Sequence, residues 1–485
     1  MLIAREKEIT LLNELYHNDA AELVALYGRR RVGKTFLVNE VFQNRITFRH
    51  AGLSPIDDQY TSDSKKKSRL KDQLKHFARS LKTAGAKTAK TPASWLDAFY
   101  LLEDFLQERD DGKTRQLVFI DEIQWLDTPR SNFMTGLEAF WNGWACSRHN
   151  IMVIVCGSST SWILDKVINN HGGLYDRVTR QINLQPFSLR ECEDYFRSAG
   201  VIFSRYDITR AYMAVGGIPY YLRYFDKKLS LPQNIDAAFF ADGAPLSGEF
   251  DRLFSSLFTN PEVMKTIILA LSRKSIGLTR KEIVRETGIA DSGEFSGYLK
   301  ALIAGNFIQK YCPFGGSRRE EYYKLSDPFC IFYLRFVKES RGRQISWNNL
   351  DGSAPVAAWE GYAFENVCFN HVKQIKTALG ISGVVTNESA WFSKGDGETG
   401  SAQIDMIIER KDNIVHLCEI KFYSDQFRMK KDDHFALVRR QNVLREKIPK
   451  KASVRNTLIS TYGLVRNEYS GDFVHSITLD DLFAL

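Results

Sequence analysis

The apolar and polar positions divide the first half of the chain into short buried strands that alternate with helices. Short apolar runs of this kind are typical of a parallel sheet covered on both faces. They lie at 23–27, 46–51, 117–121, 151–156 and 180–184. Between the second and third runs, the polar stretch 61–91 keeps one apolar helical face, formed by Leu70, Leu74, Phe77 and Leu81. It predicts a solvated helical insertion rather than a nucleic-acid contact. We therefore expect an α/β domain over residues 1–258, with a helical lid within about 186–258.

The pattern changes after residue 258. It predicts three helices and then two strands around the turn Pro313-Phe314-Gly315-Gly316. The expected helices lie near 262–273, 279–287 and 291–304, and the strands at 307–311 and 321–325. Three helices and a hairpin outline a winged helix, here assigned to 259–338. Its third helix is poor in Arg, Asn and Gln, so a structural or DNA-backbone role is favoured over base readout, with Arg318 and Arg319 at the hairpin tip.

A linker is expected at 339–358, where Gly, Ser and Pro interrupt the pattern. The last domain is assigned to 359–485. It begins with a helix that runs through Phe369, continues with a Gly/Thr-rich loop at 393–401, and then has two strands at 402–410 and 414–422. The chain is therefore expected to combine a P-loop-type parallel sheet, a winged helix and a second α/β domain.

Length and composition agree with a multidomain intracellular protein. A chain of 485 residues suggests about three domains. The net charge of +8 permits a nucleic-acid partner without requiring one. The seven cysteines are scattered singly, which fits a reducing compartment, and no apolar stretch approaches a membrane span. We expect a soluble cytoplasmic protein with no membrane partner.

The strongest chemical motif is Gly28-x-x-x-x-Gly33-Lys34-Thr35, between an apolar strand and a helical pattern. Its glycines let backbone N–H groups surround a triphosphate, Lys34 reaches the β and γ phosphates, and Thr35 can ligate magnesium. The motif predicts nucleotide binding. The expected contacts are Gly28, Arg29, Arg30, Arg31, Val32, Gly33, Lys34, Thr35 and Phe36.

Residues after the next strands complete the expected ATPase site. The strand 117–121 ends in Asp121 and Glu122, which suits magnesium binding by Asp121 and activation of water by Glu122. After the strand 151–156, Ser158 or Ser159 either senses phosphate or caps the following helix. Arg177 is a candidate arginine finger, with a surface salt bridge as the alternative.

The last domain contains a second candidate site. Asp405 lies in the strand 402–410, and Glu419 and Lys421 share one face of the strand 414–422. A turn at 411–413 can bring the three side chains together. Two carboxylates can hold magnesium or manganese, and an adjacent lysine can orient water and offset phosphate charge, which suits phosphodiester hydrolysis. An ordinary cross-strand ion pair is the alternative.

Four motifs together resemble the prokaryotic AAA+-related ATPases called archaeal-type ATPases, close to the STAND branch. They are Tyr27-Gly-Arg-Arg-Arg-Val-Gly-Lys-Thr35, Phe119-Ile-Asp-Glu-Ile-Gln-Trp125, Gln185-Pro-Phe-Ser188 and Gly216-Gly-Ile-Pro-Tyr-Tyr-Leu222. The resemblance implies ATP rather than GTP and an adenine pocket partly formed by residues 3–8. Where the family has Leu-Tyr-Gly-Arg, this chain has Leu174-Tyr-Asp-Arg177.

These ATPases typically continue into a winged helix and a restriction-type nuclease domain. The C-terminal motif resembles the PD-(D/E)XK nucleases, with Asp405 as the first acid and Glu419-x-Lys421 as the second element. The resemblance also implies a role for Glu365 on the preceding helix, although Ile404 replaces the proline of the family name. Gln441 is either a further active-site group or a surface residue.

Two functions remain open. The first is an ATPase whose nucleotide state controls a metal-dependent DNA nuclease domain, with a possible homo-oligomer. The second is a nucleotide-dependent switch or DNA-binding regulator whose last domain is a scaffold that does not cut. The first function is favoured because the chain has all four residues of the nuclease motif: Glu365, Asp405, Glu419 and Lys421.

Overall fold

The computed structural model describes residues 2–54, 63–87, 90–169, 172–174, 176–315, 321–340, 345–393 and 402–484. The expected hairpin-tip residues Arg318 and Arg319, and nearly all of the loop 393–401, lie outside these ranges. The chain forms two compact units, one of residues 1–186 with 251–261 and one of residues 187–250 with 262–485.

The first unit is built on a parallel five-stranded sheet in the order β2-β3-β4-β1-β5. Its strands are β1 (Glu22–Tyr27), β2 (Ile46–Ala51), β3 (Gln116–Asp121), β4 (Ile151–Gly157) and β5 (Arg180–Asn183). All five predicted strands are confirmed. The central three are buried along their whole length, which explains their nearly continuous apolar sequences.

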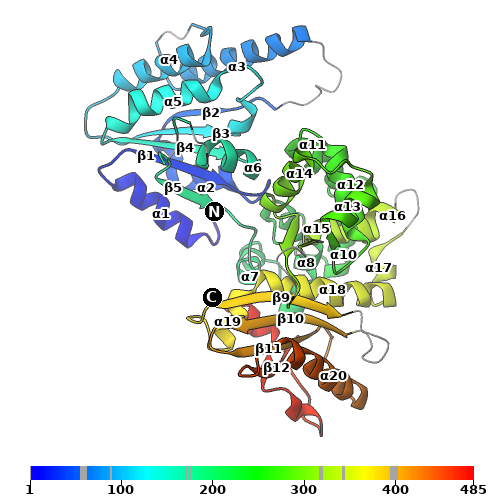
Figure 1. The fold of residues 1–485 in the computed structure, drawn as a ribbon. Helices are drawn as coiled ribbons and strands as arrows, with labels where there is room; N and C mark the ends of the chain where they lie inside the picture. The colour runs from blue at the N-terminus through cyan, green and yellow to red at the C-terminus, as the bar shows by residue number, and fades with distance from the viewer. Residues whose placement is uncertain are drawn as a thin grey trace. The chain divides into compact units, whose positions relative to one another are not determined.

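Helices cover both faces of this sheet (Figure 1). Residues from the sheet form one apolar core with residues from α3 (Asp63–Thr83), α4 (Trp95–Gln107) and α5 (Phe133–Gly143). On the other face lie α1 (Glu6–His17) and α2 (Lys34–Phe42). The predicted apolar face of the insertion is confirmed, since Leu74, Phe77 and Leu81 are buried.

The second unit begins with a group of short helices. They are α7 (Leu189–Ser198), α8 (Arg205–Val215), α9 (Pro219–Leu222) and α10 (Leu231–Phe239). Three of them start at a serine whose side chain accepts a backbone N–H of the first turn: Ser188, Ser204 and Ser230. These caps explain why the sequence places helix starts there.

The next region has the predicted three helices and hairpin. They are α12 (Pro261–Ser272), α13 (Arg280–Thr287), α14 (Gly293–Ala304), β7 (Ile308–Tyr311) and β8 (Tyr322–Leu325). The antiparallel sheet has a third strand that we did not predict, β6 (Leu278–Thr279), so the order is β6-β8-β7. It is followed by α15 (Pro328–Phe332).

The last part is a mixed five-stranded sheet in the order β13-β12-β11-β10-β9. The predicted strands are confirmed as the antiparallel pair β10 (Ala402–Arg410) and β11 (Ile414–Lys421). The strands β9 (Thr386–Ser393), β12 (Ser453–Ser460) and β13 (His475–Ile477) were not predicted. Helices of this part are α18 (Ala354–Asn370), α19 (Val372–Ala378), α20 (Lys431–Lys447) and α21 (Leu479–Leu482).

The stretch 339–358, which we expected to be a linker, is partly helical. It contains α16 (Lys338–Ser340) and α17 (Trp347–Leu350), and α18 already begins at Ala354. Pro355 lies in the first turn of α18. Proline is accepted there because its missing N–H would have had no partner within the helix. The boundaries of the three domains themselves stay predictions.

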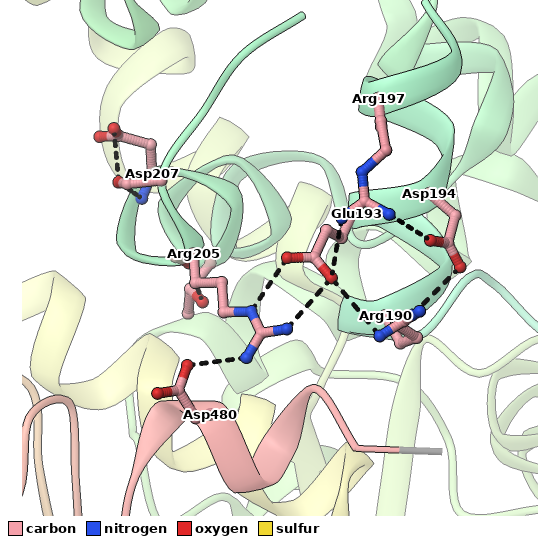
Figure 2. A network of polar contacts seen from close by, with 9 residues as sticks. Arg190, Glu193, Asp194, Arg197, Arg205, Asp207 and Asp480 are labelled. Carbon is pink, nitrogen blue, oxygen red and sulfur yellow. Dashed lines mark hydrogen bonds and ion pairs between the residues drawn. The ribbon is translucent and has the colours of Figure 1, made fainter.

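The helix α8 packs against the C-terminal elements of its own unit. Arg205 donates to Asp480 on α21 at 2.8 Å and to Glu193 on α7 at 2.9 Å (Figure 2). On α7 itself, Arg190 and Arg197 pair with the same acidic side chains, Glu193 and Asp194. The network links α7, α8 and α21 by charge. Within the described ranges, no helix is long and apolar enough to cross a membrane.

Candidate functional sites

The P-loop connects β1 to α2 with a backbone that only glycine permits at its first position. Gly28 has φ of 140°, and an added Cβ would collide with the carbonyl oxygen of Leu184. Gly33, with φ of 95°, is the N-cap of α2. The loop therefore delivers Lys34 and Thr35 to the first turn of a helix, whose N-terminus favours anions.

Lys34 is turned into this loop. Its ammonium is almost fully buried and donates to the carbonyl oxygens of Gly28 at 2.8 Å and Arg29 at 2.9 Å. Burial lowers the pKa of Lys34, and nearby acidic groups, among them Asp121 and Glu122, oppose that shift. Beside it, one guanidinium nitrogen of Arg30 is buried without a hydrogen-bond partner. These donors fit a polyphosphate, because it supplies the acceptors that a buried cation needs.

The two expected magnesium ligands are in direct contact. The hydroxyl of Thr35 donates to Oδ2 of Asp121 at 2.8 Å. Burial raises the pKa of Asp121, and this hydrogen bond opposes the rise. An adjacent hydroxyl and carboxylate at a phosphate site fit Mg²⁺, which usually takes few protein ligands and completes its shell with phosphate and water oxygens.

Glu122 is held in place by neighbours on both sides. It adopts a left-handed conformation with φ of 47°. Its Oε2 accepts from Ser158 Oγ at 2.8 Å and from Gln124 Nε2 at 2.5 Å. Of the two serines weighed from the sequence, Ser158 therefore contacts the carboxylate, while Ser159 is the N-cap residue of α6 (Thr160–Ile163) without a side-chain cap bond. Gln124 was not named as a site residue, although it lies within the motif Phe119–Trp125.

Other expected nucleotide contacts lie as follows. Phe36 is about half exposed on α2, and Arg177 is exposed. The N-terminal segment reaches the P-loop through Arg5, whose guanidinium donates to the carbonyl oxygens of Val32 and Gln185. Arg5 is one of the residues 3–8 that were expected to form part of the adenine pocket.

The four residues of the C-terminal motif come together from one helix and two strands. Lys421 Nζ lies 2.8 Å from Glu419 Oε1 on β11, and the amide of Ile420 donates to Asp405 Oδ2 on β10 at 3.0 Å. Asp405 lies where the pairing of β10 with β9 shifts register, between Ile404 and Ile407. Such an irregularity redirects a side chain and is not readable from alternation alone.

Burial and repulsion by neighbouring carboxylates raise the pKa values of Asp405 and Glu365. Burial, and then repulsion by Glu419, raises the pKa of Asp405 to about 6. Burial, and then repulsion by Asp405, raises the pKa of Glu365 on α18 to about 7. Burial alone would lower the pKa of Lys421, but its ion pair with Glu419 outweighs burial and raises it. The cluster concentrates negative charge that an added cation would stabilise.

Two cations of this site were missed by sequence analysis. Arg440 on α20 lies 2.5 Å from Glu419 Oε2, whereas the neighbouring Gln441 was the candidate. One residue along a helix changes the direction of a side chain by about 100°. Lys324 on β8 lies 4.0 Å from Glu365 Oε2. Nothing in the local sequence around residue 324 signals this contact, because it joins distant segments.

Oxygen donors of this kind fit magnesium or manganese, which bind through one or two carboxylates and keep water or phosphate oxygens. The lining of a pocket at the cluster includes Tyr311, Lys324, Glu365, Gln403 and Asp405. Within the residues that the structure describes, no three His, Cys, Asp or Glu side chains group to form a complete metal site. The case for magnesium or manganese at this cluster therefore depends on a pair of carboxylates.

Comparison with known proteins identifies the N-terminal part. A family described as an ATPase domain predominantly from Archaea matches residues 2–225. These residues form an archaeal-type P-loop ATPase domain. The ATPase domain accounts for the buried Lys34 and for the pair Thr35 and Asp121, and ATP is the nucleotide of this family.

Two proteins of known sequence are related to this chain. An uncharacterized protein of Methanocaldococcus jannaschii is 26% identical over 344 residues, which are 70% of this chain and 69% of the relative. An uncharacterized ATP-binding protein of the same organism is 40% identical over 45 residues, 9% of this chain and 76% of that protein.

A Walker-type ATPase of Pyrococcus abyssi is structurally similar, with a TM-score of 0.47 and 20% identity, over 69% of this chain and 96% of that one. The ORC2 protein of Aeropyrum pernix gives a TM-score of 0.41 with 14% identity, over 70% of this chain and 95% of that one.

Proposed function

We propose that the chain hydrolyses ATP in its ATPase domain, and that its nucleotide state controls metal-dependent hydrolysis of DNA phosphodiesters at the C-terminal carboxylate cluster. The observation that carries the nuclease proposal is the convergence of Glu365, Asp405, Glu419 and Lys421 from three separate elements. A merely structural ion pair needs two of these side chains. A cluster of all four side chains, in which two acids have raised pKa values, suits a site that binds cations and phosphate.

For ATP, each residue has a distinct task in this proposal. Lys34 binds the β and γ phosphates, and Thr35 and Asp121 hold magnesium, which neutralises charge that develops on the phosphates. Glu122, fixed by Ser158, accepts a proton from the attacking water and orients it. Arg177 is exposed and acts as a finger on the ATP of a neighbouring subunit in a homo-oligomer.

For DNA, Asp405 and Glu419 would hold the divalent cation, which would supply Lewis-acid chemistry at the phosphate. Lys421 orients the attacking water and offsets negative charge on the phosphate, while Glu365 contributes a further carboxylate. Basic residues on α20 and on either side of it follow the DNA backbone by charge. They are Lys430, Lys431, Arg439, Arg445, Lys447, Lys450, Lys451 and Arg455.

In this proposal the helix α8 carries the control by nucleotide to the carboxylate cluster. This helix belongs to the matched ATPase residues 2–225, yet its Arg210 donates to Glu360 on α18 at 2.6 Å. Helix α18 also carries Glu365. A change in the position of α8 therefore acts on an element of the carboxylate cluster through a buried ion pair.

One experiment tests the function. Purified protein is incubated with single-stranded, duplex and branched DNA, with Mg²⁺ or Mn²⁺, and with ATP, ADP or no nucleotide. We expect the wild type to cleave at least one DNA form, and this cleavage should require metal and change with nucleotide. Asp405→Ala and Lys421→Ala should each abolish DNA cleavage but leave ATP hydrolysis intact. The matched control is Lys411→Ala, in the β10–β11 turn. No cleavage under any condition would favour the nucleotide-dependent switch instead.

A further inference from the structure

Lys324 brings a positive charge to the carboxylate cluster from another part of the unit. It lies on β8, paired with Gln309 of β7, and is 8% exposed. Its ammonium is 4.0 Å from Glu365 Oε2. It also lies over the rings of Tyr362 and Phe369, with 5.0 and 5.8 Å to the ring centroids. A buried lysine with these neighbours is held by negative charge and by aromatic faces.

The hairpin that carries Lys324 is fixed to the C-terminal sheet. Phe314, which follows β7, is buried in the same apolar core as Trp391 and Ile404. Its amide donates to Ala390 at 3.4 Å, and the hydroxyl of Tyr362 donates to the carbonyl of Leu325. The ammonium is therefore delivered by a docked element and is not a surface side chain that reaches the cluster by chance.

The charges of the cluster are unevenly balanced. Glu419 has two cations in direct contact, Lys421 and Arg440. Asp405 accepts from the backbone amide of Ile420, and Glu365 forms an ion pair with Lys324. Lys324 is thus the cation that balances the Glu365 side of the cluster, on the wall of the pocket next to Asp405.

We propose that Lys324 is the resting counter-ion of the carboxylate cluster, and that a divalent cation must compete with it for Glu365 and Asp405. Two cations a few ångströms apart repel strongly in a buried site. Binding of Mn²⁺ or Mg²⁺ therefore moves the ammonium away from Glu365 into the adjoining pocket. The inference rests on the proposed metal site, but not on DNA cleavage.

The first test measures Mn²⁺ affinity of the full-length protein without nucleotide, by electron paramagnetic resonance of free Mn²⁺. Lys324→Met keeps the unbranched stem and removes the charge. We expect it to tighten Mn²⁺ binding roughly tenfold or more. Lys324→Arg should bind like the wild type. The matched control is Lys310→Met, on the partner strand β7, which removes an exposed ion pair with Glu321.

Adding Asp405→Asn to Lys324→Met assigns the effect to this site, because the gain in affinity should disappear. An unchanged or weaker Mn²⁺ affinity in a folded Lys324→Met protein overturns the proposal. So does an equal gain in Lys310→Met, which would make the effect one of general charge.

A second test uses the wild type and does not depend on whether a variant folds. Lysines are acetylated briefly with acetic anhydride, with and without Mn²⁺, and the extent at Lys324 is measured by mass spectrometry against Lys310. We expect acetylation of Lys324 to rise at least about threefold with Mn²⁺ as the ammonium leaves Glu365. No rise overturns the proposal.

The counter-ion role of Lys324 and the nuclease activity can be disproved separately. If Lys324→Met binds Mn²⁺ more tightly but no variant cleaves DNA, the counter-ion proposal stands and the nuclease proposal is rejected. If the wild type cleaves DNA but Lys324→Met binds Mn²⁺ with unchanged affinity, the nuclease proposal stands and the counter-ion proposal is rejected.

Discussion

Tyr206 on α8 stacks on Phe422, the residue that directly follows Lys421, with ring centroids 4.9 Å apart and planes 8° from parallel. One turn along the same helix, Arg210 pairs with Glu360 on α18 and with Asp351. The helix α8 thus contacts α18 and the residue that follows β11, two of the three elements that carry the carboxylate cluster. We therefore expect a shift of α8 to reach Lys421 through Phe422 and Glu365 through α18.

Removing Arg210 should loosen α18. Arg210→Ala leaves Glu360 and Asp351 partly buried without their cation, which costs about 3–5 kcal/mol when a buried pair is broken. We expect faster hydrogen exchange in peptides from 354–370 and a lower unfolding midpoint. Arg197→Ala is the control, because its side chain is 67% exposed and its pairs are long; it should change stability by less than about 0.5 kcal/mol. Equal effects of the two variants would contradict the coupling.

Lys34 and Glu122 should separate binding from hydrolysis. Lys34→Ala removes the buried ammonium and is expected to weaken ATP binding and abolish turnover. Glu122→Gln keeps the magnesium ligands Thr35 and Asp121, so it should bind ATP normally while hydrolysis falls about a hundredfold or more. Equilibrium binding of a fluorescent ATP analogue and phosphate release distinguish the two. A loss of affinity in Glu122→Gln as large as in Lys34→Ala would refute this division of tasks.

Arg177 should act across a subunit boundary. Arg177→Ala and Lys34→Ala are each expected to be inactive in ATP hydrolysis. Mixing them creates interfaces with one intact ATP site and one intact finger, so part of the activity should return, and wild-type turnover should rise with protein concentration. A wild-type protein that stays monomeric with ATP at full activity would exclude this role.

The carboxylate cluster should make metal-free stability depend on pH. Burial chiefly raises the pKa of Glu365 to about 7 and of Asp405 to about 6, and the facing groups are Glu419, Lys421 and Lys324. The native state therefore holds these protons more tightly than the unfolded chain, whose carboxyl pKa values are about 4. Stability should fall as pH rises from about 4 to about 7, by on the order of 1–3 kcal/mol, and level off above.

Thermal unfolding of the metal-free protein across this range measures the effect. Glu365→Gln should flatten the decline, since the titrating carboxyl with the higher pKa is gone. Saturating Mn²⁺ should restore most of the stability lost by the wild type at neutral pH, because the cation offsets the repulsion. A difference between wild type and Glu365→Gln that does not vary with pH would show that the cluster does not titrate in this way.

The sequence by itself determined the local elements and the linear motifs. An apolar strand can be recognised from its own residues, and a P-loop from glycines that need unusual backbone angles, so β1, Gly28, Lys34 and the pair Asp121 and Glu122 were predictable. The hairpin of Asp405 and Glu419 was also predictable, because alternation along a strand decides which side chains share a face.

Only the tertiary structure decided what surrounds these motifs. Arg440, Lys324 and Arg210 reach their carboxylate partners across 21, 41 and 150 residues. Such contacts depend on how helices and hairpins dock, and docking follows from apolar packing such as that of Phe314 in the C-terminal core. A charged residue at the surface of its own helix or strand carries no local sign of the partner it will meet, because Coulomb attraction acts on distance in space and not on separation along the chain.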